Sequence, residues 1–260
     1  MVSRKLYRYQ FQPEGEYAEL VGISDLHYGS ANFLEKKAFE HREYIQDSPD
    51  RWCFDLGDSS ENAIKGSPGA SQFQQTCPPR EQRAWVREYY SPIRNKTIAV
   101  VASNHPGRSE DLVDWSPEEN LVEFLGCAYI RWEGVLAITV GNSQVGQQYL
   151  IYTRHCVSNS SKKPQILTAL INKSRAVQGC DAYWCAHCHQ YIAEPIPAMI
   201  PDPRHGVLRK RDQWFLMGDS FMKREDGYAE QRNFDEPAEG QISLRLHKTR
   251  HEIEVVRLLY

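Results

Sequence analysis

Short apolar runs alternate with segments of helical periodicity along the first two thirds of the chain. The apolar runs predict buried strands at residues 18–24, 51–56, 97–102, 135–140, 148–153 and 181–186. Between several of these runs, apolar residues spaced three and four apart predict helices at 33–46, 79–93, 120–126 and 164–177. Such alternation is typical of an α/β fold, in which helices cover a sheet.

The last third of the chain shows mainly strand patterns. Strands are expected at residues 191–200, 213–219, 241–247 and 252–259, and the polar stretch 225–240 between them predicts a loop or a short helix. No internal repeat, low-complexity linker or block of like charges divides the sequence. We therefore expect residues 1–260 to form a single domain.

Several predicted strands stop at side chains that bind metals. These strand-end residues are Asp25, His27, Asp58, Asn104, His105, His155, His187 and His189. In open α/β sheets ligands bind outside the carboxyl ends of the strands, so residues far apart in the sequence can meet there. Carboxylate, imidazole and amide oxygen suit manganese, iron or zinc better than a soft thiolate site does.

Each of these short motifs is weak evidence when taken alone. An isolated Asp-x-His is most often a loop accident, a Gly-Asp pair is usually a turn, and a histidine on an apolar strand is more often a satisfied core residue. Their occurrence in a fixed order, each at the end of a predicted strand, favours a common site.

The stretch "CAHCH", residues 185–189, allows three interpretations. It matches the C-x-x-C-H attachment signature of a c-type haem, it could be half of a zinc knuckle through Cys185 and Cys188, or it could supply His187 and His189 as ligands. Haem attachment generally belongs to exported proteins, and no second cysteine pair stands at a suitable spacing. The histidine interpretation is therefore favoured.

Composition restricts the partners and the compartment. With 31 Lys and Arg against 34 Asp and Glu the net charge is −3, so no global attraction to nucleic acid or to an anionic membrane is expected. The amino terminus lacks the apolar core of a secretory signal, and no apolar run is long enough to span a bilayer. The 7 cysteines fit reduced thiols better than a disulfide framework. We expect a cytoplasmic protein without a membrane partner.

The strand-end motifs resemble those of the calcineurin-like metallophosphoesterases, whose series runs D-x-H, G-D-x-x-D/E, G-N-H-D/E, a single H, and G-H-x-H. Here the series is "DLH" at 25–27, "GDSSE" at 57–61, "SNHPGR" at 103–108, "TRHC" at 153–156 and "AHCH" at 186–189. The resemblance spans residues 18–190, and "FLMGDSFMKREDGYAE" at 215–230 is similar to the tail of phage-type and bacterial members. Ser103, Arg154 and Ala186 replace a glycine that the family often has, and Pro106 stands where an acid is common.

The resemblance implies a β-sandwich flanked by helices, with two divalent metal ions at the carboxyl ends of the strands. Manganese would be the first choice, with iron, zinc, nickel or cobalt as alternatives. One ion would be held by Asp25, His27, Asp58 and His189, and the other by Asp58, Asn104, His155 and His187. Asp58 would thus bridge the two ions, which activate a shared hydroxide for attack on phosphorus.

The same resemblance implies that His105 is the general acid that protonates the leaving group. Glu61 would orient the His105 ring. Beyond the family pattern, Pro106 and Gly107 predict a tight turn that folds Arg108 over the metal face, where it could grip phosphate oxygens. The alternative for Arg108 is a surface ion pair with Glu110 or Asp111.

The function expected from these motifs is a dinuclear metal-dependent phosphoesterase acting on phosphodiesters, including nucleic acids or nucleotides, or on phosphomonoesters. The alternative is a phosphoesterase fold that serves as a binding or scaffold module with little or no activity. Substrate choice is expected to depend on loops such as residues 64–79. The basic run 207–214 is expected to be a solvated strand face, with a nucleic-acid patch as the alternative. Sequence leaves the oligomeric state open.

Overall fold

The computed structural model describes residues 5–65, 67, 73–142, 146–202, 206–223 and 239–260. The predicted loop or short helix at 225–240 lies almost wholly outside the described residues, as does the centre of the expected specificity loop at 64–79.

Two mixed sheets pack face to face in the described part of the chain. The first has the strand order β1-β6-β7-β8-β10-β9 and the second has the order β12-β11-β2-β3-β4-β5. The strands are β1 (Lys5–Phe11), β2 (Tyr17–Ile23), β3 (Arg51–Asp55), β4 (Thr97–Val101), β5 (Ala128–Ile130), β6 (Gly134–Val140), β7 (Gln147–Thr153), β8 (Ala182–Cys185), β9 (Ile192–Asp202), β10 (Val207–Met217), β11 (Gln241–His247) and β12 (Ile253–Leu258).

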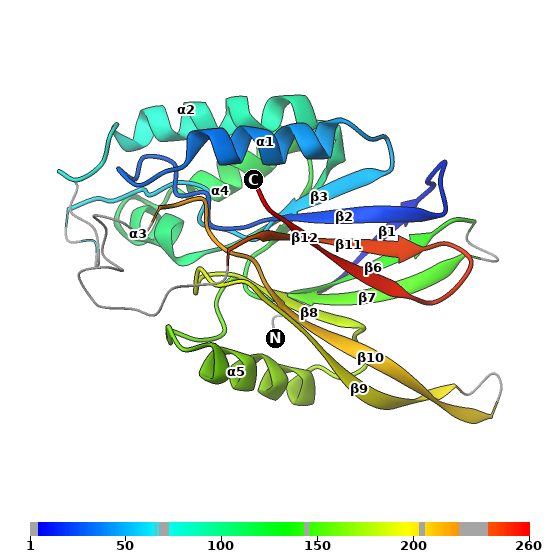
Figure 1. The fold of residues 1–260 in the computed structure, drawn as a ribbon. Coiled ribbons are helices and arrows are strands. Elements are labelled where there is room, and N and C mark those ends of the chain that lie inside the picture. Colours follow the sequence, from blue (N-terminus) through cyan, green and yellow to red (C-terminus); the bar gives the residue numbers. More distant parts are fainter. Residues whose placement is uncertain (1–4, 66, 68–72, 143–145, 203–205, 224–238) are drawn as a thin grey trace.

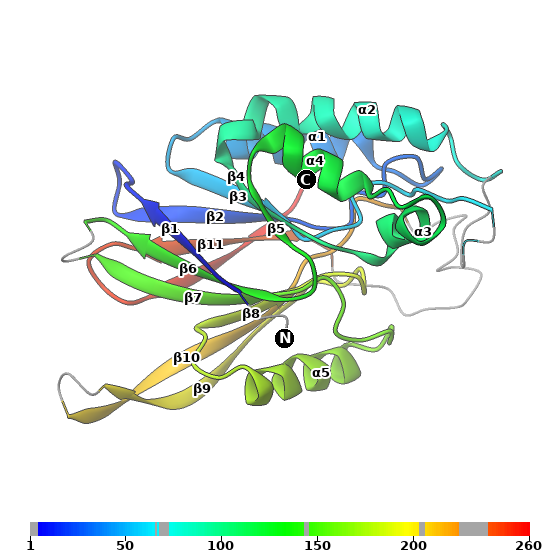
Figure 2. The same cartoon turned by 180° about the vertical axis from the view of Figure 1, so that it is seen from behind.

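Helices cover the outer faces of both sheets. They are α1 (Glu35–Gln46), α2 (Pro79–Tyr90), α3 (Asn104–Val113), α4 (Pro117–Leu125) and α5 (Lys163–Ala176), with a 3-10 turn, η1, at Ser91–Lys96. The α1, α2 and α4 helices lie over the sheet that contains β2 and β3, and α5 lies under the sheet that contains β8 and β10 (Figure 1; Figure 2, from behind). The expected β-sandwich flanked by helices is confirmed.

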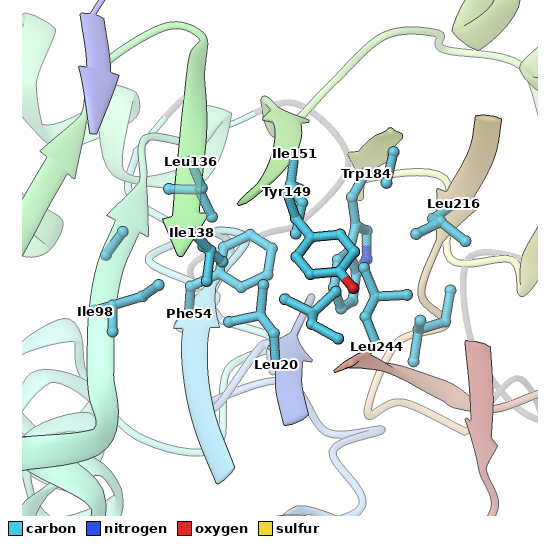
Figure 3. Packing of buried hydrophobic residues seen from close by; sticks show 14 of the residues in the cluster. Leu20, Phe54, Ile98, Leu136, Ile138, Tyr149, Ile151, Trp184, Leu216 and Leu244 are labelled. Atoms are coloured by element: carbon cyan, nitrogen blue, oxygen red, sulfur yellow. The ribbon is translucent and has the colours of Figure 1, made fainter. Parts of the chain in front are cut away.

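Apolar side chains from the two sheets interdigitate between them. Trp184 of β8 meets Phe54 of β3 edge to face, with ring centroids 5.0 Å apart, and Leu20, Ile138 and Leu244 lie around this pair (Figure 3). Gly22 is required here, because a Cβ at that position would lie 2.3 Å from Trp184 Cζ2. Burial of this continuous apolar layer fixes the sheets against each other and hence the positions of their strand ends.

Three elements differ from the sequence expectations. The β1 strand was not expected, because its half-exposed alternation of charged and aromatic residues gives a weak strand signal. The short β5 strand was also missed. The tight turn predicted at Pro106-Gly107 is wrong, because this segment is the first turn of α3, where proline costs no hydrogen bond.

The β9–β10 hairpin carries the basic run 207–214. Residues 207–210 are exposed on β10, so the expected solvated strand face is what the structure shows. None of the helices in the described part of the chain is long and apolar enough to span a membrane.

Candidate metal centre

The strand ends of both sheets meet at one edge of the sandwich. The second sheet supplies Asp25 and His27 after β2, Asp58 and Glu61 after β3, and Asn104 and His105 after β4. From the first sheet come His155 after β7 and His187 and His189 after β8. The residues selected from the sequence therefore reach a single region from two different sheets.

Asp25, His27 and His189 form one group of potential ligands. The Nε2 atoms of His27 and His189 are 3.2 Å apart, and Asp25 Oδ1 is 3.4 Å from His189 Nε2 and 3.9 Å from His27 Nε2. Their ligand atoms all lie within 4.8 Å of one another. Two imidazoles and a carboxylate at these distances could share one cation.

Asp58, His155 and His187 form a second group with the same 4.8 Å spread. Asp58 Oδ2 is 3.1 Å from His155 Nε2, and it is also 3.8 Å from His27 Nε2 in the first group. Asp58 thus lies between the groups, where one carboxylate could contact two ions.

Two polar atoms of the centre are buried without a hydrogen-bond partner in the described part of the chain. They are Asp25 Oδ1 and His187 Nδ1. Because an unsatisfied buried polar atom is costly, such atoms call for a missing partner, and a cation would satisfy both. The donor set and these two atoms fit a divalent metal.

The backbone of the centre is held in an uncommon conformation. Positive φ angles occur at Asp25 (53°), His27 (50°), Asp58 (53°), His187 (80°) and His189 (50°). Residues other than glycine adopt this region rarely, and strained positions of this kind cluster at functional sites. No pattern in the sequence predicted these positive φ angles.

Fixed acceptors orient the candidate ligand rings. Glu61 Oε2 contacts His27 Nδ1 at 3.0 Å, and the carbonyl oxygen of Leu56 contacts His155 Nδ1 at 2.8 Å. Both contacts place the proton on Nδ1 and leave Nε2 facing the other ligand atoms, as expected for metal-binding histidines.

His105 is oriented by Glu61, but through a different atom from the one expected. Its Nδ1 lies 2.8 Å from the main-chain carbonyl of Glu61 and 3.6 Å from the carboxylate. The expectation that the Glu61 carboxylate orients His105 is therefore corrected, since that carboxylate is hydrogen-bonded to His27.

Asn104 is placed differently from the other candidates. It is the first residue of α3 and is exposed, whereas the three carboxylates of the centre and the imidazoles of His27 and His155 are buried. Its role as a ligand stays a prediction.

Charges inside the centre are mutually compensated. Burial alone would raise the pKa of Asp58, but contact with His105 and His155 holds this pKa well below its usual range. The pKa of His155 is raised to about 10, because its contact with Asp58 outweighs burial. Burial lowers the pKa of His105 to about 4. The protonated imidazole of His155 thus compensates the charge of Asp58, a task that a bound cation would also perform.

The thiols of "CAHCH" lie outside both ligand groups. Cys185 is fully buried in the apolar cluster beneath β8, and Cys188 donates to the carbonyl of Ser158. All seven cysteines are free. The histidine interpretation of this stretch therefore agrees with the arrangement, whereas the zinc knuckle does not.

Arg108 lies against the centre, with its side chain 11% exposed. Its Nη1 donates to the carbonyl of Glu61 at 3.1 Å, and its Nη2 is 3.1 Å from His105 Nε2. His105 and Arg108 stand three residues apart on α3 and so share one face of the helix. The alternative pairing with Glu110 is not seen, because Glu110 contacts Arg131; the side chain of Asp111 lies outside the described part of the molecule.

We expect Arg108→Ala to keep metal content unchanged and to lower kcat/KM by about tenfold or more, because a guanidinium can grip two phosphate oxygens. Arg108→Lys should recover only part of the loss, since a point charge lacks the bidentate fork. Steady-state kinetics and elemental analysis provide the check. Wild-type kinetics in Arg108→Ala would show that the residue does not touch the substrate.

Ser103 connects the centre to a buried carboxylate on α4. The backbone N–H of Asp58 donates to Ser103 Oγ at 2.8 Å. Ser103 Oγ and its own N–H donate in turn to Glu118 at 2.5 and 3.1 Å. Close to this link a Cβ on Gly57 would lie 2.5 Å from Ser103 Cβ, and the φ of Gly57 is +101°. Ser103 thus forms a hydrogen-bonded link between the centre and α4.

Glu118 makes stability depend on pH. It is 3% exposed, and burial raises its pKa from 4.5 to about 8. Between these two pH values the folded chain holds a proton that the unfolded chain has released. The contribution of this proton to the stability of the fold is therefore complete below pH 4.5 and is lost as pH rises to about 8. Glu118→Gln cannot ionise and should be more stable than wild type at pH 8, by about 1–3 kcal/mol. Urea melts with chelator at pH 5 and pH 8 measure this, and an equal difference at both pH values would contradict it.

No family model matches the chain, and no curated protein matches it in sequence. Among solved structures, the fold is similar to that of a conserved uncharacterised protein described as a predicted phosphoesterase from Streptococcus pneumoniae, with 12% identity, a TM-score of 0.41, and 94% of this chain and 93% of that chain covered.

Two other solved structures are similar over most of their length. Vps29 complexed with zinc, from Entamoeba histolytica, has 14% identity and a TM-score of 0.43, with 92% of this chain and 98% of that chain covered. A metallophosphoesterase from Sphaerobacter thermophilus has 11% identity and a TM-score of 0.38, with 90% of this chain and 89% of that chain covered. Because all three TM-scores are below 0.5, inferences about function rest on the side chains of the centre.

Proposed function

We propose that the chain is a metal-dependent phosphoesterase that hydrolyses phosphodiester or phosphomonoester bonds. The observation that carries the proposal is the pair of Asp/His groups joined by Asp58, with two buried polar atoms that have no partner in the described part. Asp25, His27, Asp58 and His189 would hold one divalent ion, and Asp58, His155 and His187, with Asn104, the other. When bound, such ions supply Lewis-acid activation of water and of phosphate oxygens.

The chain's own residues would handle the proton of the leaving group. The Glu61 carbonyl fixes a hydrogen on His105 Nδ1, which leaves Nε2 as the atom that can give or take a proton. Nε2 lies 3.8 Å from Asp58 Oδ2, so it faces the space between the two groups. With a pKa of about 4 the His105 ring is neutral at pH 7 in the metal-free chain, so Nε2 would have to gain a proton before it could protonate the departing oxygen of the ester.

Arg108 and the ring partners would provide positioning. The guanidinium of Arg108 contacts His105 Nε2, and a phosphate group would compete for these donors, which frees Nε2 for the proton transfer. Glu61 keeps the Nε2 atom of His27 turned toward Asp25 and His189. These fixed contacts would reduce reorganisation during the reaction.

The test compares hydrolysis of bis(p-nitrophenyl) phosphate and p-nitrophenyl phosphate by chelated protein and by protein supplied with Mn2+, Zn2+, Fe2+, Ni2+ or Co2+. Turnover that requires a metal and saturates at two ions per chain supports the proposal. Comparison of the two esters also separates diester from monoester preference. Absence of turnover with every metal would refute it.

Two observations favour the second candidate, a metal-binding module without turnover. Asn104 is exposed, and in this arrangement Arg108 occupies the His105 nitrogen that would carry the proton. Two bound ions without hydrolysis of any phosphate ester, including dinucleotides and nucleotides, would establish this alternative. We place the activity in the cytoplasm as part of the proposal, with manganese as the first metal.

A further inference from the structure

Two thiols flank the metal centre without belonging to either ligand group. Cys156 directly follows His155, and Cys188 stands between His187 and His189. Both are free and partly buried. The α5 helix and the β8 strand separate the two thiols in the sequence. Each thiol is nevertheless next to a candidate ligand, Cys156 in the loop after β7 and Cys188 in the loop after β8.

Both thiols donate to the same oxygen atom. Cys156 Sγ is 3.5 Å and Cys188 Sγ is 3.1 Å from the carbonyl oxygen of Ser158. Two sulfur atoms in contact with one oxygen are necessarily close neighbours.

The loops that carry these thiols are also linked through their backbones. The β7 and β8 strands pair in parallel up to Thr153 and Trp184. Beyond the strand ends, Ala186 N–H donates to the His155 carbonyl at 2.8 Å, so the residue before Cys156 contacts the segment that leads to Cys188.

The third cysteine of this region is not an equivalent partner. Cys185 is fully buried, and its side chain packs with Ile192 and Met217 in the apolar cluster below β8. The geometry therefore singles out Cys156 and Cys188 as the pair.

We propose that Cys156 and Cys188 form a reversible disulfide when a hydroperoxide oxidises the protein, and that this bond weakens metal binding at the centre. The effect on the metal rests on the function proposed above, whereas the disulfide itself does not. One thiolate attacks the peroxide to give a sulfenic acid and one water. The second thiolate attacks that sulfur, the S–S bond forms and a second water leaves, so two thiols lose two electrons to one hydrogen peroxide.

The disulfide acts on the ligands through their shared loops. It draws the His155 loop and the His187–His189 loop together and removes both thiols from Ser158. Since His187 and His189 are held at positive φ, a small displacement of Cys188 turns both rings away from their partners. Loss of such supporting contacts typically weakens metal affinity by about 10–100-fold.

Reduction by a dithiol restores the open form.

The test uses the full-length, metal-free protein treated with hydrogen peroxide, blocked with N-ethylmaleimide and digested without reduction. Mass spectrometry should find a peptide linked through Cys156 and Cys188 in wild type and in Cys127→Ser, a matched control for a partly buried thiol elsewhere. The link should be absent in Cys156→Ser and in Cys188→Ser, whose folding is checked by circular dichroism. Either serine variant alone is sufficient for this comparison.

Calorimetric titration with Mn2+ measures the effect of the disulfide on metal affinity. Oxidised wild type should bind Mn2+ about 10–100-fold more weakly than reduced wild type, with recovery after dithiothreitol, and the serine variants should not respond. Absence of the linked peptide, or a link through Cys185, would overturn the disulfide. Unchanged affinity after complete linkage would overturn the effect on the metal. Reduced wild type that binds no metal would refute the proposed function, and the peptide result would still decide the disulfide.

Discussion

Asp58→Asn is expected to lose metal from both positions and to abolish hydrolysis. Asp58 Oδ2 lies 3.1 Å from His155 Nε2 in one group and 3.8 Å from His27 Nε2 in the other, so it is the carboxylate common to both. An amide has one oxygen and no charge, and it cannot serve two cations. Elemental analysis after dialysis measures the ions per chain.

Asp181→Asn is the matched control for this variant. Asp181 is also a buried carboxylate, but it lies before β8, at the opposite end of that strand from the centre, where it contacts His251 and the N–H of Leu150. Its substitution should leave the metal content unchanged. Two ions per chain in Asp58→Asn, or equal losses in both variants, would rule out the bridging assignment.

His105→Ala should reduce hydrolysis of an alkyl phosphodiester by about 10²–10⁴-fold, the usual contribution of general-acid catalysis. The loss on a nitrophenyl ester should be much smaller, because nitrophenolate leaves without a proton. Metal content should stay at the wild-type value, since His105 is assigned to the proton rather than to an ion. Kinetics on both esters provide the comparison.

His251→Ala serves as the control for removal of a partly buried imidazole away from the centre, beside Asp181. It should retain activity on both esters. Equal losses on the alkyl and nitrophenyl esters in His105→Ala would assign His105 a structural role. Loss of metal in that variant would instead make it a ligand, as its place beside His27 and Asp58 allows.

Sequence reasoning found most of the strands because their apolar runs are long and end at polar residues. It missed β1, whose charged positions such as Arg8 hide the alternation on an exposed edge. It also mistook the start of α3 for a turn, because Pro106 and Gly107 are typical of both. Arg108 nevertheless reached the centre, through the helical spacing of three from His105 rather than through a turn.

The chemistry of the centre was predictable as a set of residue types, whereas its atomic contacts were not. Sequence cannot tell that the carbonyl of Glu61 holds His105 while its carboxylate holds His27, because that depends on the path of a loop. The exposure of Asn104 and the link from Ser103 to Glu118 are likewise products of packing between α3 and α4. The five positive φ angles arise from tertiary constraint, which local propensity does not encode.

Because the candidate ligands come from both sheets, the metal centre depends on the packing of the two sheets against each other. Asp25, His27 and Asp58 belong to the sheet of β2 and β3, while His155, His187 and His189 belong to the sheet of β7 and β8. Each of the two groups assigned to an ion takes residues from both sheets, so separation of the sheets would break up both groups. Ions bound there would therefore stabilise the packed sandwich by mass action.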